Sequence, residues 1–307
     1  MDRELPPPAA GPAAPGRLTL MAQPVPPDGA EMTSVADRWV ENRAPSGWHK
    51  VDLRELWAYR ELILFLAVRD VKVRYKQAAL GMAWAVLQPL AGALVFTLVF
   101  DRIANLPSDG IPYPVFAFVG VTVWTYFTTS VQTAMASLVG NVGLVTKVYF
   151  PRMAAPIAAV VPGLLDMGIS LLILGVLMAV YGVSPGLPLL ALPLCVVVLV
   201  ALAFGVGLVL ATLNVRYRDV KGVSALLLQL WLFASPVAYG STVIKDRWDL
   251  LYALNPMAGL IDAFRWSLLG GSAPDADALL SLVVLGGILV VGLAVFAREE
   301  RRFADII

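Results

Sequence analysis

The side chains able to perform acid–base, nucleophilic or metal chemistry are few and scattered. The sequence holds one cysteine, Cys195, and one histidine, His49, so no Cys/His cluster has metal-site spacing. Asp275-Ala276-Asp277 has the DxD spacing that metal-dependent sugar-nucleotide transferases use. It also suits a solvated helix start, where carboxylates interact favourably with the helix dipole. We favour the helix start and predict neither a catalytic residue nor a metal site.

The chain carries no recognisable sequence for binding ATP. The P-loop that cradles nucleotide phosphates ends in Lys followed by Ser or Thr. No lysine of this sequence is followed by either residue. If ATP drives this protein, another subunit therefore binds the nucleotide.

Composition places these sparse polar residues in a membrane. Of the 307 residues, 59% are hydrophobic and only 15% are charged, whereas a soluble domain has about a quarter charged residues. Lipid must therefore be the main solvent of the chain. The formal net charge of +1 indicates no nucleic-acid partner.

Six apolar stretches are each long enough for the ~20 residues that cross the hydrocarbon core. The predicted spans cover residues 80–100, 115–138, 153–181, 187–213, 223–244 and 278–297. Asp166, in the third span, is the only charged residue within them. Because a carboxylate is costly in lipid, Asp166 has either a function or a bond to a neighbouring helix, and both interpretations stay open.

Two different segments precede the spans. Residues 1–50 are rich in proline and poor in large apolar side chains, which predicts a disordered cytoplasmic tail. In residues 51–78, apolar side chains recur at helical spacing between basic ones, as is typical of an amphipathic helix in the membrane interface. A break in that helix is allowed near Arg69 or Asp70. Its candidate functional residues are Trp57, Arg60, Arg69, Arg74 and Tyr75.

A seventh apolar stretch, residues 250–271, carries Asp262 and Arg265. Each ion costs about 2.5–3.5 kcal/mol at the bilayer centre on insertion scales, so we predict a re-entrant pair of short external helices here. Six spans with both termini in the cytoplasm place all but four of the 23 Lys and Arg residues on the cytoplasmic side, as the positive-inside rule requires. The DxD sequence then lies outside, away from cytosolic nucleotide sugars. The fold predicted for residues 79–307 is an all-α integral membrane domain with six transmembrane helices.

Two predicted cytoplasmic loops offer surfaces for a partner. The loop between spans two and three is apolar for a solvent-facing connection, which indicates either a protein contact or helices that continue into the interface. Its exposed patch is predicted to comprise Leu144, Val145, Val148, Tyr149 and Phe150. The loop between spans four and five is either a second partner contact or a positive-inside anchor. Its candidate residues are Arg216, Tyr217, Arg218 and Asp219.

A series of short motifs resembles the type-2 ABC polysaccharide exporter permeases, the membrane subunits that export O-antigen, teichoic-acid and polyol-phosphate glycans. The resemblance covers the chain from about residue 52 to its end, and the order and spacing of the motifs are more specific than any one of them. The motifs are Leu53-Arg54-Glu55-Leu56, Tyr59-Arg60-Glu61-Leu62, Arg69-Asp70-Val71-Lys72-Val73-Arg74-Tyr75-Lys76-Gln77, Leu80-Gly81, Trp84, Gln88-Pro89, Lys147-Val148-Tyr149-Phe150-Pro151-Arg152, Val215-Arg216-Tyr217-Arg218-Asp219-Val220, Ser235-Pro236-Val237 and Leu254-Asn255-Pro256-Met257.

The resemblance implies a homodimer in the bacterial inner membrane, bound to two cytoplasmic ATPase subunits that hold ATP and Mg²⁺, with no cofactor on this chain. A lipid-linked glycan would pass through a channel between the protomers, which membrane lipids surround. The interface helix would guard the cytoplasmic entrance. The loop between spans two and three would dock in an ATPase cleft through Asn141, Leu144, Lys147, Val148, Tyr149, Phe150, Pro151 and Arg152.

Aromatic side chains suit such a channel, because their faces stack loosely on sugar rings whereas fixed charges would trap a sliding polymer. They also suit interfacial belts and helix packing. The candidates are Trp84, Phe96, Phe100, Trp124, Tyr126, Phe127, Trp231, Phe233 and Tyr239. A small-molecule or drug type-2 ABC permease is the nearest competing function. A membrane glycosyltransferase is less well supported, because the external carboxylates do not cluster. An ion-coupled transporter is also less well supported, because such proteins usually carry several charges inside their spans and this chain has one.

Overall fold

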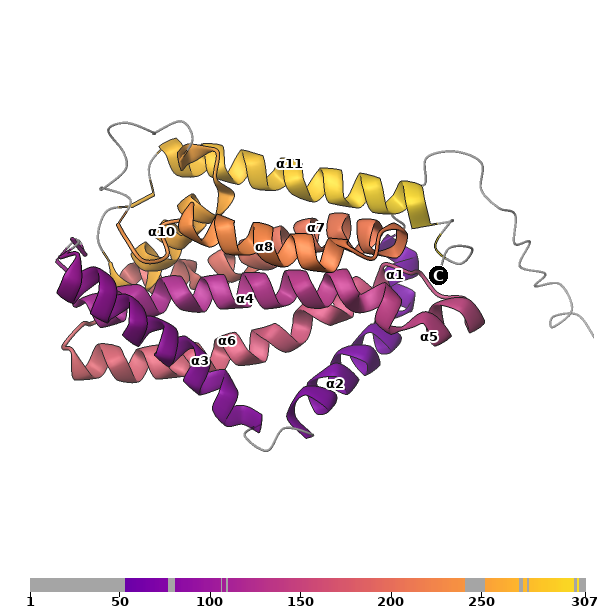
Figure 1. The fold of residues 1–307 in the computed structure, drawn as a ribbon. Coiled ribbons are helices and arrows are strands. Elements are labelled where there is room, and N and C mark those ends of the chain that lie inside the picture. Colours follow the sequence, from indigo (N-terminus) through magenta and orange to yellow (C-terminus); the bar gives the residue numbers. More distant parts are fainter. Residues whose placement is uncertain are drawn as a thin grey trace, which may run out of the picture. The chain divides into compact units, whose positions relative to one another are not determined.

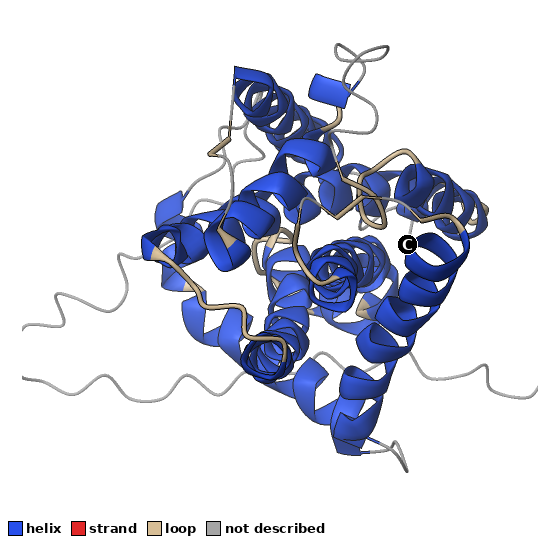
Figure 2. Ribbon diagram, turned by 90° about the vertical axis from the view of Figure 1, so that its left-hand side faces the viewer, coloured by secondary structure: helices blue, strands red, loops and turns tan. Residues whose placement is uncertain are grey.

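The structure is a computed structural model that describes residues 53–76, 81–105, 107–108, 110–240, 252–270, 273–274, 276–300 and 303. The proline-rich tail predicted for residues 1–50, and with it His49, lies outside the described residues. Every regular element in the described part is helical (Figure 2). The prediction of an all-α fold is confirmed.

The helices follow one another along the chain as shown in Figure 1. A π-helical turn (η1) continues α3, and a 3₁₀ turn (η2) leads into α7. The elements are α1 Leu53–Ala58, α2 Arg60–Lys76, α3 Gly81–Phe96, η1 Thr97–Ile103, α4 Tyr113–Gly140, α5 Val142–Lys147, α6 Ala154–Val180, η2 Leu187–Ala191, α7 Leu192–Arg216, α8 Val220–Phe233, α10 Pro256–Leu269 and α11 Ala276–Glu299.

Five helical stretches in the described part are long and apolar enough to cross a membrane. They are Val86–Ile103, Tyr113–Gly140, Ala154–Val180, Leu187–Arg216 and Ala278–Glu299. They correspond to the first, second, third, fourth and sixth predicted spans. The fifth predicted span, which includes most of α8, is the one without a match, and the count of six spans stays a prediction.

The long helices alternate between two ends of the bundle. At the α5 end, the last turns of α4, α7 and α11 pack with α5 and the start of α6. This α5-end cluster consists of Leu138, Val145, Phe150, Met153, Ala154, Ala155, Leu208, Ala211, Phe296 and Phe303. At the opposite α10 end, α10 packs against η2 and the starts of α4 and α11 (Figure 1).

Helix α4 is the centre of the bundle, with most of its residues buried between α6 and α7. Several of its hydroxyl groups bond to backbone carbonyls, because lipid offers no water to solvate them. Thr133 Oγ1 reaches the carbonyl of Ala159 on α6 at 2.9 Å, and the Tyr126 hydroxyl reaches that of Val160 at 3.4 Å. These bonds fix α4 against α6.

In the fifth predicted span, residues 223–244, helix α8 ends at Phe233, so the expectation of a continuous helix is wrong for residues 234–240. Residues 234–240 form turns instead. Pro236 is the local cause, because it has no backbone N–H to donate and disfavours helical geometry at Ser235. Helix α8 has 14 residues and advances only about 21 Å at 1.5 Å per residue.

Helix α2 runs unbroken through Arg69 and Asp70, so the break allowed there is absent. The two side chains pair with each other, with Arg69 Nη2 2.7 Å from Asp70 Oδ1. The interruption lies instead at Tyr59, between α1 and α2. Helix α2 buries Leu66 and Ala67 in a cluster with Ala158 of α6, while several apolar side chains on its other faces are exposed. Those side chains are Leu64, Phe65, Val68 and Val73.

Helices α7 and α11 touch backbone to backbone at a pair of glycines. A Cβ atom on Gly292 would lie 2.4 Å from the carbonyl oxygen of Gly205, far inside van der Waals contact. Small residues at such crossings let membrane helices approach closely. Close packing matters in lipid, because the hydrophobic effect does not drive helices together there. The two glycines therefore set the spacing between α7 and α11.

We expect Gly292→Ala to lower the thermal stability of the detergent-solubilised protein, because the added methyl group must push two helix backbones apart. Overpacking of this kind costs about 1–3 kcal/mol. The matched control is Gly287→Ala on the same helix, where a Cβ would meet nothing within 4 Å. Equal melting temperatures for the two variants would show that the glycine contact does not set the helix spacing.

Candidate functional site

The loop between α4 and α6 divides into a buried base and an exposed tip. The side chain of Tyr149 is 72% exposed and that of Val148 is also exposed, whereas Phe150 is 4% exposed within the α5-end cluster. Val145 is buried in the same cluster. The predicted exposed patch is therefore wrong for Val145 and Phe150, because Val145 within α5 and Phe150 after it both pack into the α5-end cluster.

The base of this loop is tied to helices on both sides. Asn141 Nδ2 donates to the carbonyl of Ser137 at 2.7 Å. The backbone N–H of Arg152 donates to Glu300 Oε1 at 2.9 Å, and the Arg152 guanidinium donates to the Glu300 carbonyl at the end of α11. Pro151 and Leu144 are partly buried, and Lys147 is exposed. The tip therefore stands on a fixed base.

The exposed tip also meets the first helix of the described chain. The Tyr149 hydroxyl lies 3.4 Å from Glu55 Oε1 of α1. The Glu55 carboxylate, with partial burial of the ring, raises the pKa of the Tyr149 phenol. On the same helix, Trp57 is exposed beneath the Arg60 guanidinium, whose carbon is 5.8 Å from the ring centre. Aromatic side chains of α1 and of the tip are thus presented at one end.

The second loop, between α7 and α8, is exposed at all four of its candidate residues, Arg216, Tyr217, Arg218 and Asp219. The guanidinium carbon of Arg216 lies 5.5 Å from the centre of the Tyr217 ring. Asn214 joins this loop to α4, since its Nδ2 donates to the Met135 carbonyl at 3.2 Å. These contacts leave open whether the loop binds a partner or anchors the helix ends.

Asp166 is bonded to the end of the interface helix. Arg74 Nη1 lies 2.5 Å from Asp166 Oδ2, and the Tyr75 hydroxyl donates to Asp166 Oδ1. The structure thus brings together three candidates that come from separate parts of the sequence. Because an unpaired carboxylate inside a bundle is costly, this cluster fixes the last turn of α2 to the middle of α6.

Several predicted channel-lining aromatics are packed inside the protomer. Trp124 and Phe127 are buried, and Trp231 packs edge-to-face on both, with ring centres 6.4 and 5.2 Å away. Tyr126 is also buried, against α6. Trp124, Tyr126 and Phe127 are thus buried within one copy of the chain, and their role as channel lining stays a prediction.

The remaining aromatic candidates lie nearer the surface. Phe233 is exposed at the end of α8, and Phe96 and Phe100 form an edge-to-face pair with centres 5.7 Å apart. Tyr239 is partly buried, and its hydroxyl donates to the Phe233 carbonyl at 3.1 Å. The side chain of Trp84 lies outside the described residues.

The α10 end contains a polar cluster that the sequence analysis did not assign. Asn255 Nδ2 donates to the carbonyl of Ala234 and to Ser235 Oγ, each at 3.0 Å. Its Oδ1 accepts from the Trp231 indole at 2.9 Å and from the backbone N–H of Met257 at 3.1 Å. The Asn255 side chain therefore caps the start of α10 and also hydrogen-bonds to the C-terminal end of α8.

Arg265 completes this α10-end cluster, although only 6% of it is exposed. Its Nη2 donates to the Val237 carbonyl at 2.9 Å and its Nη1 to the Tyr239 carbonyl at 3.2 Å. The guanidinium stacks on Phe116 of α4, 3.6 Å from the ring centre, and lies 3.8 Å from Asp262 Oδ1. The sequence indicated that Arg265 would be costly in lipid, but it could not predict which backbone carbonyls accept hydrogen bonds from it.

Gly120 of α4 makes room for this arrangement. A Cβ atom there would lie 2.3 Å from the Val237 carbonyl oxygen. Tyr113 lies about two turns before Gly120 in α4, and its hydroxyl donates to the Ala238 carbonyl. A glycine within an apolar span was the available sequence signal for this close approach.

Metal binding finds no support in the described part of the chain, where no three His, Cys, Asp or Glu side chains come together as a possible metal site. Asp275 and the side chain of Asp277 lie outside the described residues. The DxD interpretation is therefore not tested by this geometry.

Comparison with known proteins connects these elements to a family. A family model described as ABC-2 type transporter matches residues 61–269, which include the tip, Asp166 and the α10-end cluster. The chain belongs to the ABC-2 type transporter family. The family predicted from the short motifs is thereby confirmed, and the chain is a multi-pass membrane protein of the permease type.

Relatives within the ABC-2 type family carry informative names. The chain is 35% identical over 262 residues to the O-antigen export system permease protein RfbA of Myxococcus xanthus, covering 83% of this chain and 98% of that protein. It is 30% identical over 250 residues to the RfbA permease of Klebsiella pneumoniae, covering 80% and 95%. It is 24% identical over 242 residues to the polysialic acid transport protein KpsM of Escherichia coli, covering 76% and 92%.

We expect Asp166→Leu to destabilise the protein, because it leaves Arg74 without the carboxylate that lies beside it. A hydrogen bond to a charged group contributes about 1.5–3 kcal/mol. The double variant Arg74→Leu with Asp166→Leu should lose less than the sum of the two single losses, since it leaves neither charge behind. Melting temperatures in detergent measure all three. Additive losses would mean that the pair does not hold α2 to α6.

Proposed function

We propose that this chain is the permease subunit of an ATP-driven exporter that moves a lipid-linked polysaccharide across the bacterial inner membrane. The observation that carries the proposal is its similarity, over almost their entire length, to permeases named for O-antigen export. The likeness to a polysialic acid transport protein extends it to a second glycan. These names favour a glycan over a drug or another small molecule as the substrate.

The proposed assembly is a homodimer with two cytoplasmic ATPase subunits, which supply the nucleotide site. The α5 end then faces the cytoplasm together with both termini, and the α10 end faces outward. The exposed tip supports this orientation: Val148 and Tyr149 stand out from a base held by Arg152 and Glu300. An exposed aromatic on a fixed base is the kind of anchor that carries a large share of binding energy at an interface.

The polymer path is proposed to run between protomers rather than through one. The aromatic core of α4 and α8 is filled within the protomer, as the contact of Phe127 with Trp231 shows. Apolar side chains on α3 and α8 are exposed on the protomer, where they can contact lipid or the second copy of the chain. They include Leu87, Leu94, Leu226, Leu230 and Phe233.

We expect Tyr149→Ala to weaken binding of the ATPase subunit by about 2–4 kcal/mol, as truncation of a hot-spot residue does, while the melting temperature of the permease stays unchanged. Phe150→Ala should instead lower that temperature, since deletion of a buried phenylalanine costs about 3–5 kcal/mol. The exposed neighbour Thr146→Ala is the control. The measurements are co-purification of the ATPase and polysaccharide at the surface of living cells.

Two outcomes separate the parts of this proposal. Full ATPase binding and full export by Tyr149→Ala would show that the tip is a passive connection. Unchanged surface polysaccharide in cells that lack the chain altogether would contradict polysaccharide export itself.

A further inference from the structure

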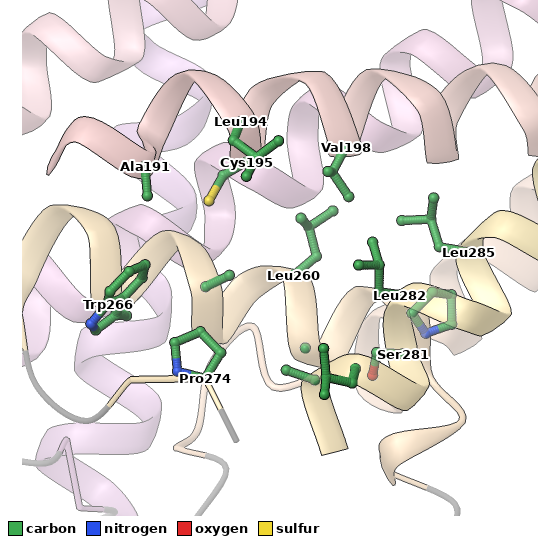
Figure 3. A pocket seen from close by; sticks show the side chains of 15 residues that line it. Ala191, Leu194, Cys195, Val198, Leu260, Trp266, Pro274, Ser281, Leu282 and Leu285 are labelled. Carbon is green, nitrogen blue, oxygen red and sulfur yellow. The ribbon is translucent and has the colours of Figure 1, made fainter. Parts of the chain in front are cut away.

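A groove lies at the α10 end between α7, α10 and α11, with a volume of about 510 Å³ (Figure 3). Leu194 and Cys195 of α7 stand on one side, and Leu260 of α10 with Leu282 and Leu285 of α11 on the other. Trp266 and Pro274 lie toward one end of the groove (Figure 3). The groove is separate from the tip and from the contacts of Arg265.

The lining of the groove is almost entirely apolar, and its polar side-chain groups are the Trp266 indole, the Cys195 thiol and the Ser281 hydroxyl. It contains no charged side chain. The hydroxyl of Ser281, which is part of the wall, already donates to the carbonyl of Ala253 at 2.9 Å and to that of Asn255 at 3.2 Å. Apolar cavities do not hold ordered water, because water needs polar partners there. A lining with so few polar groups favours an apolar occupant.

The groove is continuous with the surface that faces lipid. Leu194 and Leu279 line it and are also largely exposed, and their exposed neighbours Val197 and Val283 lie outside it. These residues belong to two helical stretches that are long and apolar enough to cross a membrane. The mouth of the groove therefore opens onto the apolar outer surface of two helices of membrane-spanning length.

Size distinguishes a lipid chain from a protein helix. An α-helix with its side chains is about 10–12 Å across and advances 5.4 Å per turn, so this groove would hold only about one turn of a helix from a second copy. The volume falls within the range of ~300–1,000 Å³ that small-ligand sites occupy. A narrow, flexible hydrocarbon chain fills such a space more completely than a helix does.

We propose that this groove is a binding site for one acyl chain of a membrane phospholipid. The acyl chain lies against α7 on one side and against α10 and α11 on the other, and fills the space that these three helices leave between them. The inference depends on the membrane location of the helices and is independent of the exported polymer.

The test uses purified full-length protein in vesicles of phosphatidylethanolamine and phosphatidylglycerol that contain a phosphatidylcholine with a diazirine in its acyl chain. After illumination, mass spectrometry maps the labelled peptides. We expect labelling to concentrate on groove residues such as Leu260 and Ala263, relative to the exposed residues Leu172 and Val176 of α6.

Filling the groove from either wall should abolish this preference. The variants are Leu282→Trp on α11 and Leu194→Trp on α7, and each has a matched control one to three residues away that lies outside the groove. Val283→Trp and Val197→Trp should keep the wild-type labelling pattern. Because the two filling variants lie on different helices, a folding defect in one leaves the other as a test.

Three results would overturn the proposal. Labelling of the wild-type groove at the level of α6 would show that no chain is held there. Preferential labelling that persists in both filling variants would place the chain elsewhere. Cross-linking of two protein copies through Leu279→Cys, in place of lipid labelling, would assign the groove to a second protomer.

Discussion

Backbone carbonyls that lose their helical partners must find others, and this constraint governs the α10 end of the protein. Helix α8 ends at Phe233, and Ser235, Val237 and Ala238 after it are buried in the bundle, where each unsatisfied polar group costs several kcal/mol. Asn255, Arg265 and Tyr113 donate to the carbonyls that follow. The broken helix is possible only because these three side chains converge on it.

The same constraint explains why a cation sits within an otherwise apolar segment. Arg265 offers donors in a fixed fork, and two of its nitrogens donate to two carbonyls that follow α8, those of Val237 and Tyr239. Its charge is compensated by the face of Phe116 and by Asp262. The absence of a side chain at Gly120 lets the turn approach α4. The Arg265 guanidinium, the Phe116 ring and Gly120 together hold the residues that follow α8.

Helix α11 connects this α10-end cluster to the proposed ATPase-docking end. Near its start, Ser281 donates to the carbonyl of Asn255, and at its end Glu300 accepts from Arg152 beside the tip. The helix has 24 residues, about 36 Å at 1.5 Å per residue. The tip and the α10-end cluster are thus connected by one helix with polar contacts near both of its ends.

The sequence predicted the helical fold and the long spans, because apolar length is a local property. Asp262 and Arg265 lie within the unbroken helix α10, and the re-entrant pair expected over residues 250–271 stays a prediction. Pro236 and Asn255-Pro256 were local signals for a helix end and a helix start. The partners could not be predicted: Arg265 lies 28 residues from Val237 in the chain, and only packing brings them together. Likewise Tyr149 and Phe150 look alike in sequence, and the α5-end cluster decides which of them is buried.

The most direct test of this account is the stability of Arg265→Met compared with that of Arg102→Met, whose arginine is an exposed cation. Methionine keeps an unbranched chain of similar length but removes every donor, and each buried carbonyl left without a partner costs about 1–3 kcal/mol. The account predicts a clearly lower melting temperature for Arg265→Met and faster proteolysis within residues 234–240, with Arg102→Met like the wild type. Equal stability and equal proteolysis of the two variants would contradict it.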